Sequence, residues 1–238
     1  MKAFQISTTA KTQNTTYQYY SQIAMIFVSL LLTANVIGEK PLLLGPIILP
    51  AGLLLFPITY LLGDVLTEVY GFAQSRRVIW MGMLCNLFMA GMCRLAIELP
   101  ALDTWERGAA YAEVLGVSSR LMAISVSTYF IGEFVNAYIV AKLKIRMQGR
   151  LFWARALCGS WIGEGIETSL FISLAFFGTM PNEVLLKLAG FYYSFKVIYA
   201  ICAMPFANKL ASFLKKKEQL DFYDQGTNFN PFAISSMK

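Results

Sequence analysis

The sequence contains no histidine among its 238 residues, and only 14% of them are charged. Without imidazole groups, catalytic zinc sites and histidine proton relays are not expected. All four cysteines lie inside apolar runs, which indicates small buried side chains rather than a disulfide framework. The chain also lacks a phosphate-binding P-loop, a His-based metal motif and a G-x-S-x-G elbow. We therefore expect no enzymatic activity, no cofactor, no metal site and no ATP hydrolysis by the chain itself.

Hydrophobic residues make up 57% of the chain, and its mean hydropathy is +0.55. A soluble globular domain would carry roughly 25% charged residues, so this composition indicates an integral membrane protein. Segments of about 20 apolar residues are long enough to span a bilayer. Six such segments cover residues 20–38, 47–69, 76–97, 118–141, 153–178 and 187–212.

The predicted fold is therefore an all-α integral membrane protein, a bundle of six transmembrane helices in one domain over residues 20–212. Residues 1–19 are a polar N-terminal segment, and residues 213–238 are a C-terminal tail. The second span begins with PLLLGPIILPAG, which is too rich in Pro and Gly for a plain helix. A short hairpin or a re-entrant turn is expected at this outer end of the span.

The placement of lysine and arginine predicts the orientation of the bundle. Fourteen of these residues fall on the side that holds both termini, and five fall on the other side. Because cytoplasmic flanks collect Lys and Arg, we expect both termini in the cytoplasm and the loop from Glu98 to Glu113 outside. The net charge of +6 comes from these flanks and from the tail, so no nucleic-acid partner is expected.

Polar residues inside the spans are the main functional signal. An ionised side chain at mid-bilayer costs about 2.5–3.5 kcal/mol, and one lysine neutralises at most one of five carboxylates. The bundle is therefore expected to enclose a hydrated cavity, which is the candidate substrate site. The residues concerned are Asp64 and Glu68 on the second span, Glu133 and Asn136 on the fourth, Glu164 and Glu167 on the fifth, and Lys196 on the sixth.

Glycine precedes an acid in three of the spans. The glycine allows a neighbouring backbone or a ligand to approach closely beside the acid. The second and fifth spans match further, LGDVLTEV against IGEGIETS, which suggests an inverted repeat. The alternative is that glycine beside a buried acid simply recurs. The three motifs are Leu62-Gly63-Asp64, Ile131-Gly132-Glu133 and Ile162-Gly163-Glu164.

Each acid also has a structural alternative. Asp64 and Glu68 could end the second span and pair with Arg76 and Arg77. The glutamates of the fourth and fifth spans could hold helices together through Lys196. Lys196 itself could be a counter-ion for an acid or a direct donor to substrate.

Five further candidates lie near the acids. Asn35 could reach an outer vestibule or make an interhelical hydrogen bond. The aromatic residues could stack on a flat ring, although 14% of the chain is aromatic and most such residues must face lipid or core. The aromatic candidates are Phe56, Tyr60, Trp161 and Phe195.

The sequence resembles the queuosine-precursor transporter family, also called the vitamin uptake transporter family, from about residue 22 to residue 232. Glu167 departs from the family pattern, where aspartate is expected, so the reach of its carboxylate differs. The matching stretches are LPAGLLLFPITYLLGDVLTEVYG with Arg76-Arg77, IGEFVNAYIVAKLK with Arg155, GSWIGEGIETSLFISLAFFG, YYSFKVIYAICAMP with Lys196, and DFYDQGTNFNPF in the tail.

The resemblance implies a multi-pass protein of the bacterial inner (plasma) membrane. It also implies import of 7-cyano-7-deazaguanine and 7-aminomethyl-7-deazaguanine, precursors of the tRNA base queuosine. The residues suit such a substrate. A carboxylate accepts both N–H donors of a guanine-like edge, and Asn136 or Lys196 can donate to its carbonyl oxygen.

Other functions remain open at this point. The chain could be a substrate-binding subunit energised by separate ATPase partners, or an acid-lined cation pore. A membrane-embedded enzyme would need a nucleophile that we cannot identify. Transport could be coupled to protons through one of the acids, or the substrate could be trapped by metabolism. The oligomeric state is also open, and a homo-oligomer is allowed.

Overall fold

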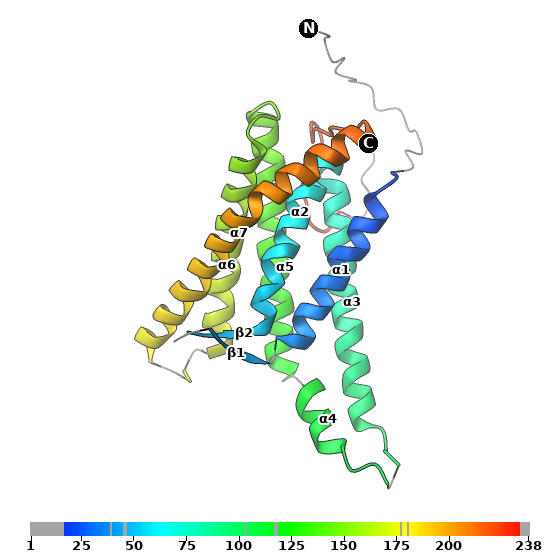
Figure 1. Cartoon of the computed structure of the whole chain (residues 1–238), viewed down its shortest axis with the longest axis vertical. Coiled ribbons are helices and arrows are strands. Elements are labelled where there is room, and N and C mark those ends of the chain that lie inside the picture. The colour runs from blue at the N-terminus through cyan, green and yellow to red at the C-terminus, as the bar shows by residue number, and fades with distance from the viewer. Residues whose placement is uncertain are drawn as a thin grey trace.

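The computed structural model describes residues 17–38, 40–44, 47–102, 104–116, 119–176, 178–179 and 181–233, which form a bundle of helices (Figure 1). A hairpin of β1 (Pro41–Leu44) and β2 (Ile47–Pro50), followed by a 3-10 turn (Ala51–Leu54), joins α1 to α2. The helices are α1 (Tyr20–Ile37), α2 (Phe56–Tyr70), α3 (Phe72–Glu98), α4 (Gly108–Leu115), α5 (Ser119–Arg146), α6 (Phe152–Phe176) and α7 (Asn182–Glu218).

Within the described residues, five helical segments are long and apolar enough to cross a membrane: α1, the 3-10 turn continued by α2, α3, most of α5, and α7. This finding confirms an all-helical membrane protein, whereas the predicted count of six spans is not confirmed. The 25 residues of α6 would be long enough at about 1.5 Å per residue. However, α6 carries Arg155, Glu164 and Glu167, which lower its apolar character. The short α4 lies in the predicted external loop.

The predicted irregularity before the second span is confirmed as a hairpin. Strands β1 and β2 pair antiparallel from Pro41 opposite Pro50 to Leu44 opposite Ile47. The prolines occupy the ends of the two strands, where a missing N–H donor is tolerated. Pro57 then lies in the first turn of α2, where its fixed φ favours the helical conformation. The hairpin marks one end of the bundle, which we call the hairpin end.

Helix α2 is the centre of the bundle. Of its spanning segment, 72% is buried, compared with 22% for α1 and α3. It ends at Gly71, whose φ of +84° is accessible to glycine at little cost and separates α2 from α3. Because α2 has almost no lipid-facing surface, its polar side chains can reach only neighbouring helices or an internal cavity.

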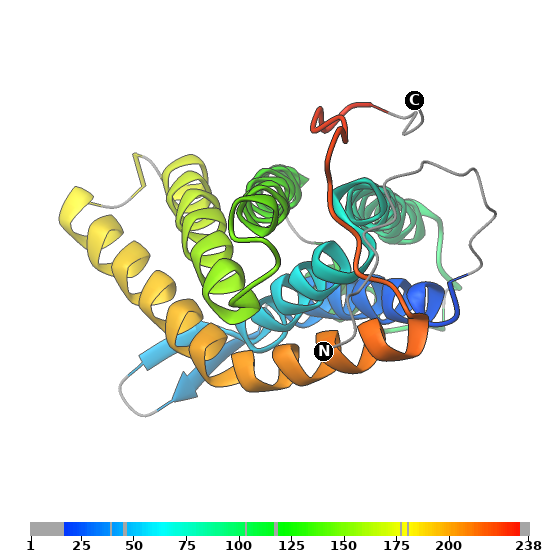
Figure 2. The same cartoon turned by 90° about the horizontal axis from the view of Figure 1, so that it is seen from above.

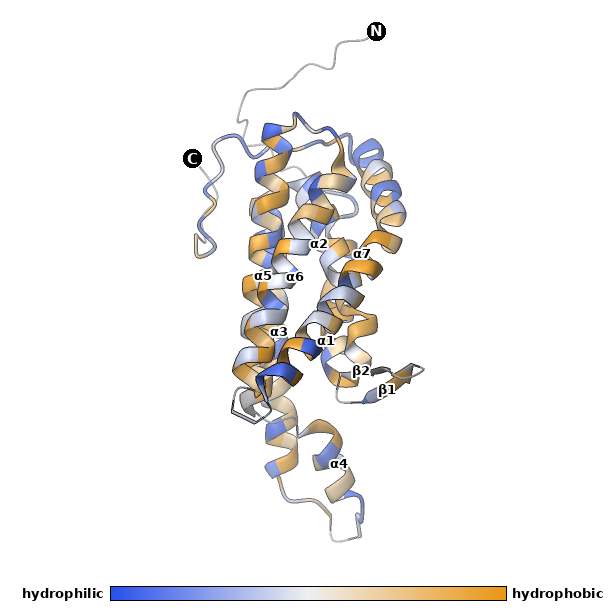
Figure 3. Ribbon diagram, turned by 90° about the vertical axis from the view of Figure 1, so that its left-hand side faces the viewer, coloured by the Kyte–Doolittle hydropathy of each residue, from blue (hydrophilic) through white to orange (hydrophobic). Residues whose placement is uncertain are grey.

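The outer surface of the bundle is apolar. Large side chains on the surface include Phe88 at 72% exposure, Ile198 at 62% and Phe206 at 73%. Much of α5 and α7 is coloured as apolar, and hydrophilic residues lie toward both ends of the bundle (Figure 3). An exposed apolar surface of this extent suits contact with lipid.

The C-terminal segment 219–233 folds back across the end opposite the hairpin, which we call the tail end (Figure 2). Its backbone carbonyls accept hydrogen bonds from Arg76, at 2.8 Å from Asn228 and Asn230, and from the indole of Trp80, at 2.7 Å from Pro231. The predicted span 187–212 extends at both ends, because α7 runs from Asn182 to Glu218. The predicted N-terminal segment 1–19 lies largely outside the described residues.

Candidate functional site

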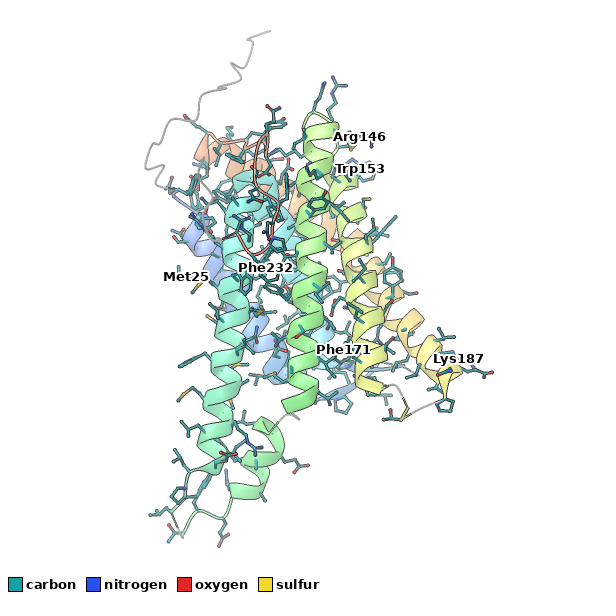
Figure 4. All side chains as sticks on the ribbon, turned by 180° about the vertical axis from the view of Figure 1, so that it is seen from behind. Met25, Arg146, Trp153, Phe171, Lys187 and Phe232 are labelled. Carbon is teal, nitrogen blue, oxygen red and sulfur yellow. The ribbon has the colours of Figure 1, made fainter. Side chains whose placement is uncertain are left out.

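A cavity of about 170 Å³ lies between α1, the 3-10 turn, α5, α6 and α7 toward the hairpin end. Figure 4 shows Phe171, one of its lining residues, on α6 in that part of the bundle. Two aromatic lining residues were not predicted as site residues: Phe171 on α6 and Tyr192 on α7. The predicted site residues that line the cavity are Asn35, Phe56, Glu167 and Lys196.

Lys196 forms its ion pair with Glu167, at an N–O distance of 2.5 Å, and also donates to the Thr168 hydroxyl at 3.3 Å. The carboxylate of Glu167 accepts a further hydrogen bond from the Tyr60 hydroxyl at 3.2 Å. The side chains of Lys196 and Glu167 are 7% and 12% exposed, and both line the cavity. The cavity therefore presents one carboxylate and one ammonium group side by side.

Asp64 lies deeper in the bundle and is fully buried. Its two oxygens accept hydrogen bonds from the Asn136 amide at 2.8 Å and from the Ser160 hydroxyl at 3.2 Å. Ser160 was missed by the sequence analysis, although it lies one helical turn before Glu164 on the same face. The structure therefore brings Asp64 and Asn136 together, but neither lines the cavity.

Glu133 and Glu164 are also fully buried, and none of their four carboxyl oxygens has a hydrogen-bond partner among the described residues. The Asn136 amide oxygen is unpartnered in the same way. A buried charge without a partner costs several kcal/mol in protein interiors. The two glutamates are therefore distinct from Glu167, which has both a cation and access to the cavity.

Glycines allow this close packing of acids. A Cβ atom added at Gly63 would collide with the Glu133 carboxylate, so only a residue without a side chain admits that carboxylate beside α2. Gly132 on α5 and Gly163 on α6 face each other, and a Cβ at either would meet the backbone carbonyl of the other, at 2.8 and 2.6 Å. The structure thus confirms that these glycines permit close backbone approach.

Glu68 lies away from the cavity, at the tail end. It accepts two hydrogen bonds from Arg155, at 2.7 and 3.0 Å, and pairs with Lys215 at 2.5 Å. The alternative that Glu68 pairs with Arg76 is wrong, because the Arg76 guanidinium binds carbonyls of the tail. Arg155 was not predicted as a partner of Glu68, although an arginine inside an apolar segment is a signal for a buried ion pair.

Lys144 extends this ion-pair cluster to the tail. Its ammonium group lies 3.8 Å from Glu68 and 2.5 Å from Asp221, and Lys215 lies 2.9 Å from Asp221. Partial burial alone would raise the pKa of Asp221, but the hydrogen bonds and charges of the two lysines lower this pKa below its usual value. Burial raises the pKa of the neighbouring Asp224, which accepts hydrogen bonds from the backbone N–H of Phe72.

The remaining candidates divide between cavity and surface. Asn35 lines the cavity and also makes an interhelical hydrogen bond to Asn86 at 3.0 Å, so both interpretations of this residue hold. Tyr60 is buried, with its hydroxyl on Glu167. Phe195 is half-buried and does not line the cavity. Trp161 is 41% exposed on the outer surface of α6, and the structure does not bring it to the acids.

The described residues contain no group of three or more His, Cys, Asp or Glu side chains that could hold a metal ion. What they do contain is a cavity between apolar helices, with a charged pair in its wall and further acids behind it. Apolar spanning helices around such a partly charged interior define a multi-pass membrane protein that handles a polar solute.

Comparison with known proteins identifies the family. Residues 50–209 match the family described as "Putative vitamin uptake transporter", and the chain belongs to this family. The chain is also 23% identical over 145 residues to the "Probable queuosine precursor transporter" of Bacillus subtilis (strain 168). The match covers 60% of this chain and 63% of that relative. No solved structure matches the chain.

Proposed function

We propose that this protein imports queuosine precursors, 7-cyano-7-deazaguanine or 7-aminomethyl-7-deazaguanine, across the bacterial inner membrane. The observation that carries the proposal is the charged pair of Glu167 and Lys196 in the wall of a cavity. Membership of a family of transporters and the similarity to a queuosine precursor transporter support the choice of substrate.

The cavity residues fit the edge of a 7-deazaguanine. The Glu167 carboxylate would accept the two adjacent N–H donors of the guanine-like edge, and such charge-assisted hydrogen bonds are the stronger kind. Lys196 would donate to the carbonyl oxygen next to these donors. Phe56, Phe171 and Tyr192 line the same cavity and offer faces for stacking on the flat ring, a contact of about 1–3 kcal/mol per base.

In this proposal α6 is the sixth span, and the tail end faces the cytoplasm. Lys144 and Arg146 at the end of α5 support this orientation, as do the three lysines 215–217 at the end of α7, because cytoplasmic flanks collect positive charge. The cavity would then face outward. The buried ion pairs of Glu68 and the folded tail would close the inner side, which is what alternating access requires of an outward-facing state.

The direct test is uptake of radiolabelled 7-cyano-7-deazaguanine in bacterial cells that cannot synthesise it. We expect uptake in cells that express the chain, competition by the aminomethyl precursor, and loss of uptake in the Glu167→Gln variant. Proteoliposomes without any ATPase separate this function from that of a subunit energised by a partner. Absence of uptake in both systems, with the protein correctly inserted, would contradict the proposal.

A further inference from the structure

Two carboxyl groups in the bundle are not explained by substrate recognition in the cavity. Glu133 on α5 and Glu164 on α6 are fully buried, and their oxygens have no hydrogen-bond partner among the described residues. Neither residue lines the cavity. A substrate bound between Glu167 and Lys196 therefore does not touch them in the conformation described.

The surroundings of Glu133 supply no positive charge. The charged groups that act on it are Asp64 on α2 and the two glutamates of α6, and the phenols of Tyr60 and Tyr129 also interact with it electrostatically. Asp64 already accepts hydrogen bonds from neutral donors on α5 and α6. Among the described residues, the charged groups that act on Glu133 are therefore all acids.

The surroundings of Glu164 contain one cation, and that cation is engaged elsewhere. Lys196 and Tyr193 face Glu164 from α7, and Glu167 faces it from one turn further along α6. The ammonium group of Lys196 makes its close contacts with Glu167 and the neighbouring threonine. Two ionised glutamates would therefore be buried with like charges around them and no counter-ion of their own.

We infer that Glu133 and Glu164 are proton-carrying groups that couple the entry of substrate to the entry of protons. The inference rests on the proposed transport function and adds its energy source. While the cavity faces outward, each carboxyl group holds a proton as an O–H bond and is neutral. When the interior opens to the other side, water reaches these groups, the O–H bond breaks, and the proton leaves to the cytoplasm.

Tyr60 provides the link between cavity and interior. Its hydroxyl donates a hydrogen bond to Glu167, which lines the cavity, and lies beside Gly132, the residue before Glu133, without a hydrogen bond to Glu133 or Glu164 in this conformation. A phenol accepts a proton from one side and donates one to the other. Protons from outer water would thus reach the interior acids through Glu167 and Tyr60 before the cavity closes. Because 7-cyano-7-deazaguanine is neutral, each accompanying proton moves one positive charge inward.

The test uses the purified full-length chain in proteoliposomes with a pH-sensitive dye inside. Adding 7-cyano-7-deazaguanine outside at equal pH is expected to acidify the lumen. A proton gradient, acid outside, is expected to raise the accumulation ratio about tenfold per pH unit for each coupled proton. Substrate accumulation that a sodium gradient drives in place of a proton gradient would overturn the inference. Substrate entry without acidification of the lumen would also overturn it.

Substrate counterflow at equal pH separates this inference from the proposed function. Counterflow needs binding and alternating access but no net proton movement. If the wild-type protein shows no counterflow, the proposed function fails. If counterflow proceeds while a proton gradient changes nothing, only the proton coupling fails.

Variants then assign the protons to residues. Glutamine keeps the size of glutamate but carries no transferable acid proton. We expect Glu133→Gln and Glu164→Gln each to retain counterflow and to lose one of the two coupled protons, which halves the dye signal per substrate and weakens the gradient response. Tyr60→Phe is expected to slow acidification without changing the final proton stoichiometry. Full coupling in both glutamine variants would overturn the assignment. Should either variant fail to insert, the dye measurement on the wild-type protein still decides whether protons move.

Discussion

Arg155 holds Glu68 by two hydrogen bonds of 2.7 and 3.0 Å, and neither side chain is exposed to solvent. The pair joins the start of α6 to the last turn of α2 at the tail end of the bundle. Lys215 from α7 and Lys144 from α5 approach the same carboxylate, so four helices meet at one acid. This cluster ties the helices together at the tail end of the bundle.

Removing Arg155 should destabilise the protein strongly. The Arg155→Leu variant removes two hydrogen bonds from the buried Glu68 and leaves it Lys215 as a partner, and each hydrogen bond to a charged group contributes about 1.5–3 kcal/mol. The loss is measured as the change in free energy of unfolding in detergent micelles. Arg94→Leu is the matched control, because Arg94 pairs with Glu98 on the surface at 63% and 57% exposure. Its effect should stay within about 1 kcal/mol. Equal effects of the two variants would contradict the burial argument.

Alanine at Gly63 should disturb the acid cluster. The added Cβ would collide with the Glu133 carboxylate, and overpacking of this kind typically costs about 1–3 kcal/mol. We expect a lower melting temperature and reduced transport. Gly91→Ala on α3 is the control, since a Cβ there meets nothing within 4 Å. That variant should match the wild type or gain up to about 1 kcal/mol, because alanine favours the helix.

Glu167 should be the most sensitive position in the cavity. In Glu167→Gln the substrate loses a charged acceptor and Lys196 loses its counter-ion. A hydrogen bond to a charged group contributes about 1.5–3 kcal/mol, so we expect substrate affinity to fall about ten- to a hundredfold, as measured by equilibrium binding of labelled 7-cyano-7-deazaguanine. Glu167→Asp keeps the charge and should lose less. If Glu167→Gln and Glu167→Asp lose the same substrate affinity, the carboxylate does not bind the substrate.

Trp161 should tolerate substitution. Its side chain is 41% exposed on the outer surface of α6 and does not line the cavity. The Trp161→Leu variant keeps an apolar side chain toward lipid, so uptake should stay within about twofold of wild type. Phe56→Leu is the paired test, because Phe56 does line the cavity. Stronger loss at Trp161 than at Phe56 would place the substrate outside this cavity.

The ion pairs that Asp221 of the tail forms with the helices should weaken only at acidic pH. Lys144 and Lys215 lower the pKa of Asp221 in the folded protein. A carboxylate with a lowered folded pKa stabilises the fold above its unfolded value of about 3.9, and this stability is lost as the pH falls through the folded pKa. The window therefore lies below about pH 4.

Hydrogen exchange of residues 219–233 measures this effect, and the difference between wild type and Asp221→Asn isolates it. The comparison is needed because the raised pKa of Asp224 acts in the opposite direction, favouring the fold as this group becomes protonated. The two proteins should converge in acid. A difference that persists unchanged at low pH would contradict the assigned cause.

The irregular start of the second span was predictable because Pro and Gly act locally. The chain from Pro41 to Pro50 cannot continue a helix, and the structure has a hairpin there. The close approach at Gly132 and Gly163 was predictable for a similar reason, since each glycine lies directly beside a buried acid. Both features depend on the conformations that one or two residues can adopt.

The partners of the acids were not predictable in this way. The sequence left open which carboxylate Lys196 neutralises, and it suggested Arg76 and Arg77 as partners for Glu68. In the structure Lys196 pairs with Glu167, 29 positions away, and Glu68 with Arg155, 87 positions away. Such pairs depend on how each helix is rotated about its axis.

By itself, the sequence determined that this is a helical membrane protein with more acids in its spans than it has cations to neutralise them. Composition and hydropathy suffice for that, because the bilayer excludes charge along the whole length of a span. Only the tertiary structure decided that Glu167 lines a cavity, that Glu68 forms an ion-pair cluster, and that Trp161 lies on the outer surface, away from the cavity. The physical reason is that lipid-facing and core-facing side chains are equally apolar, so the sequence pattern does not reveal the rotation of each helix.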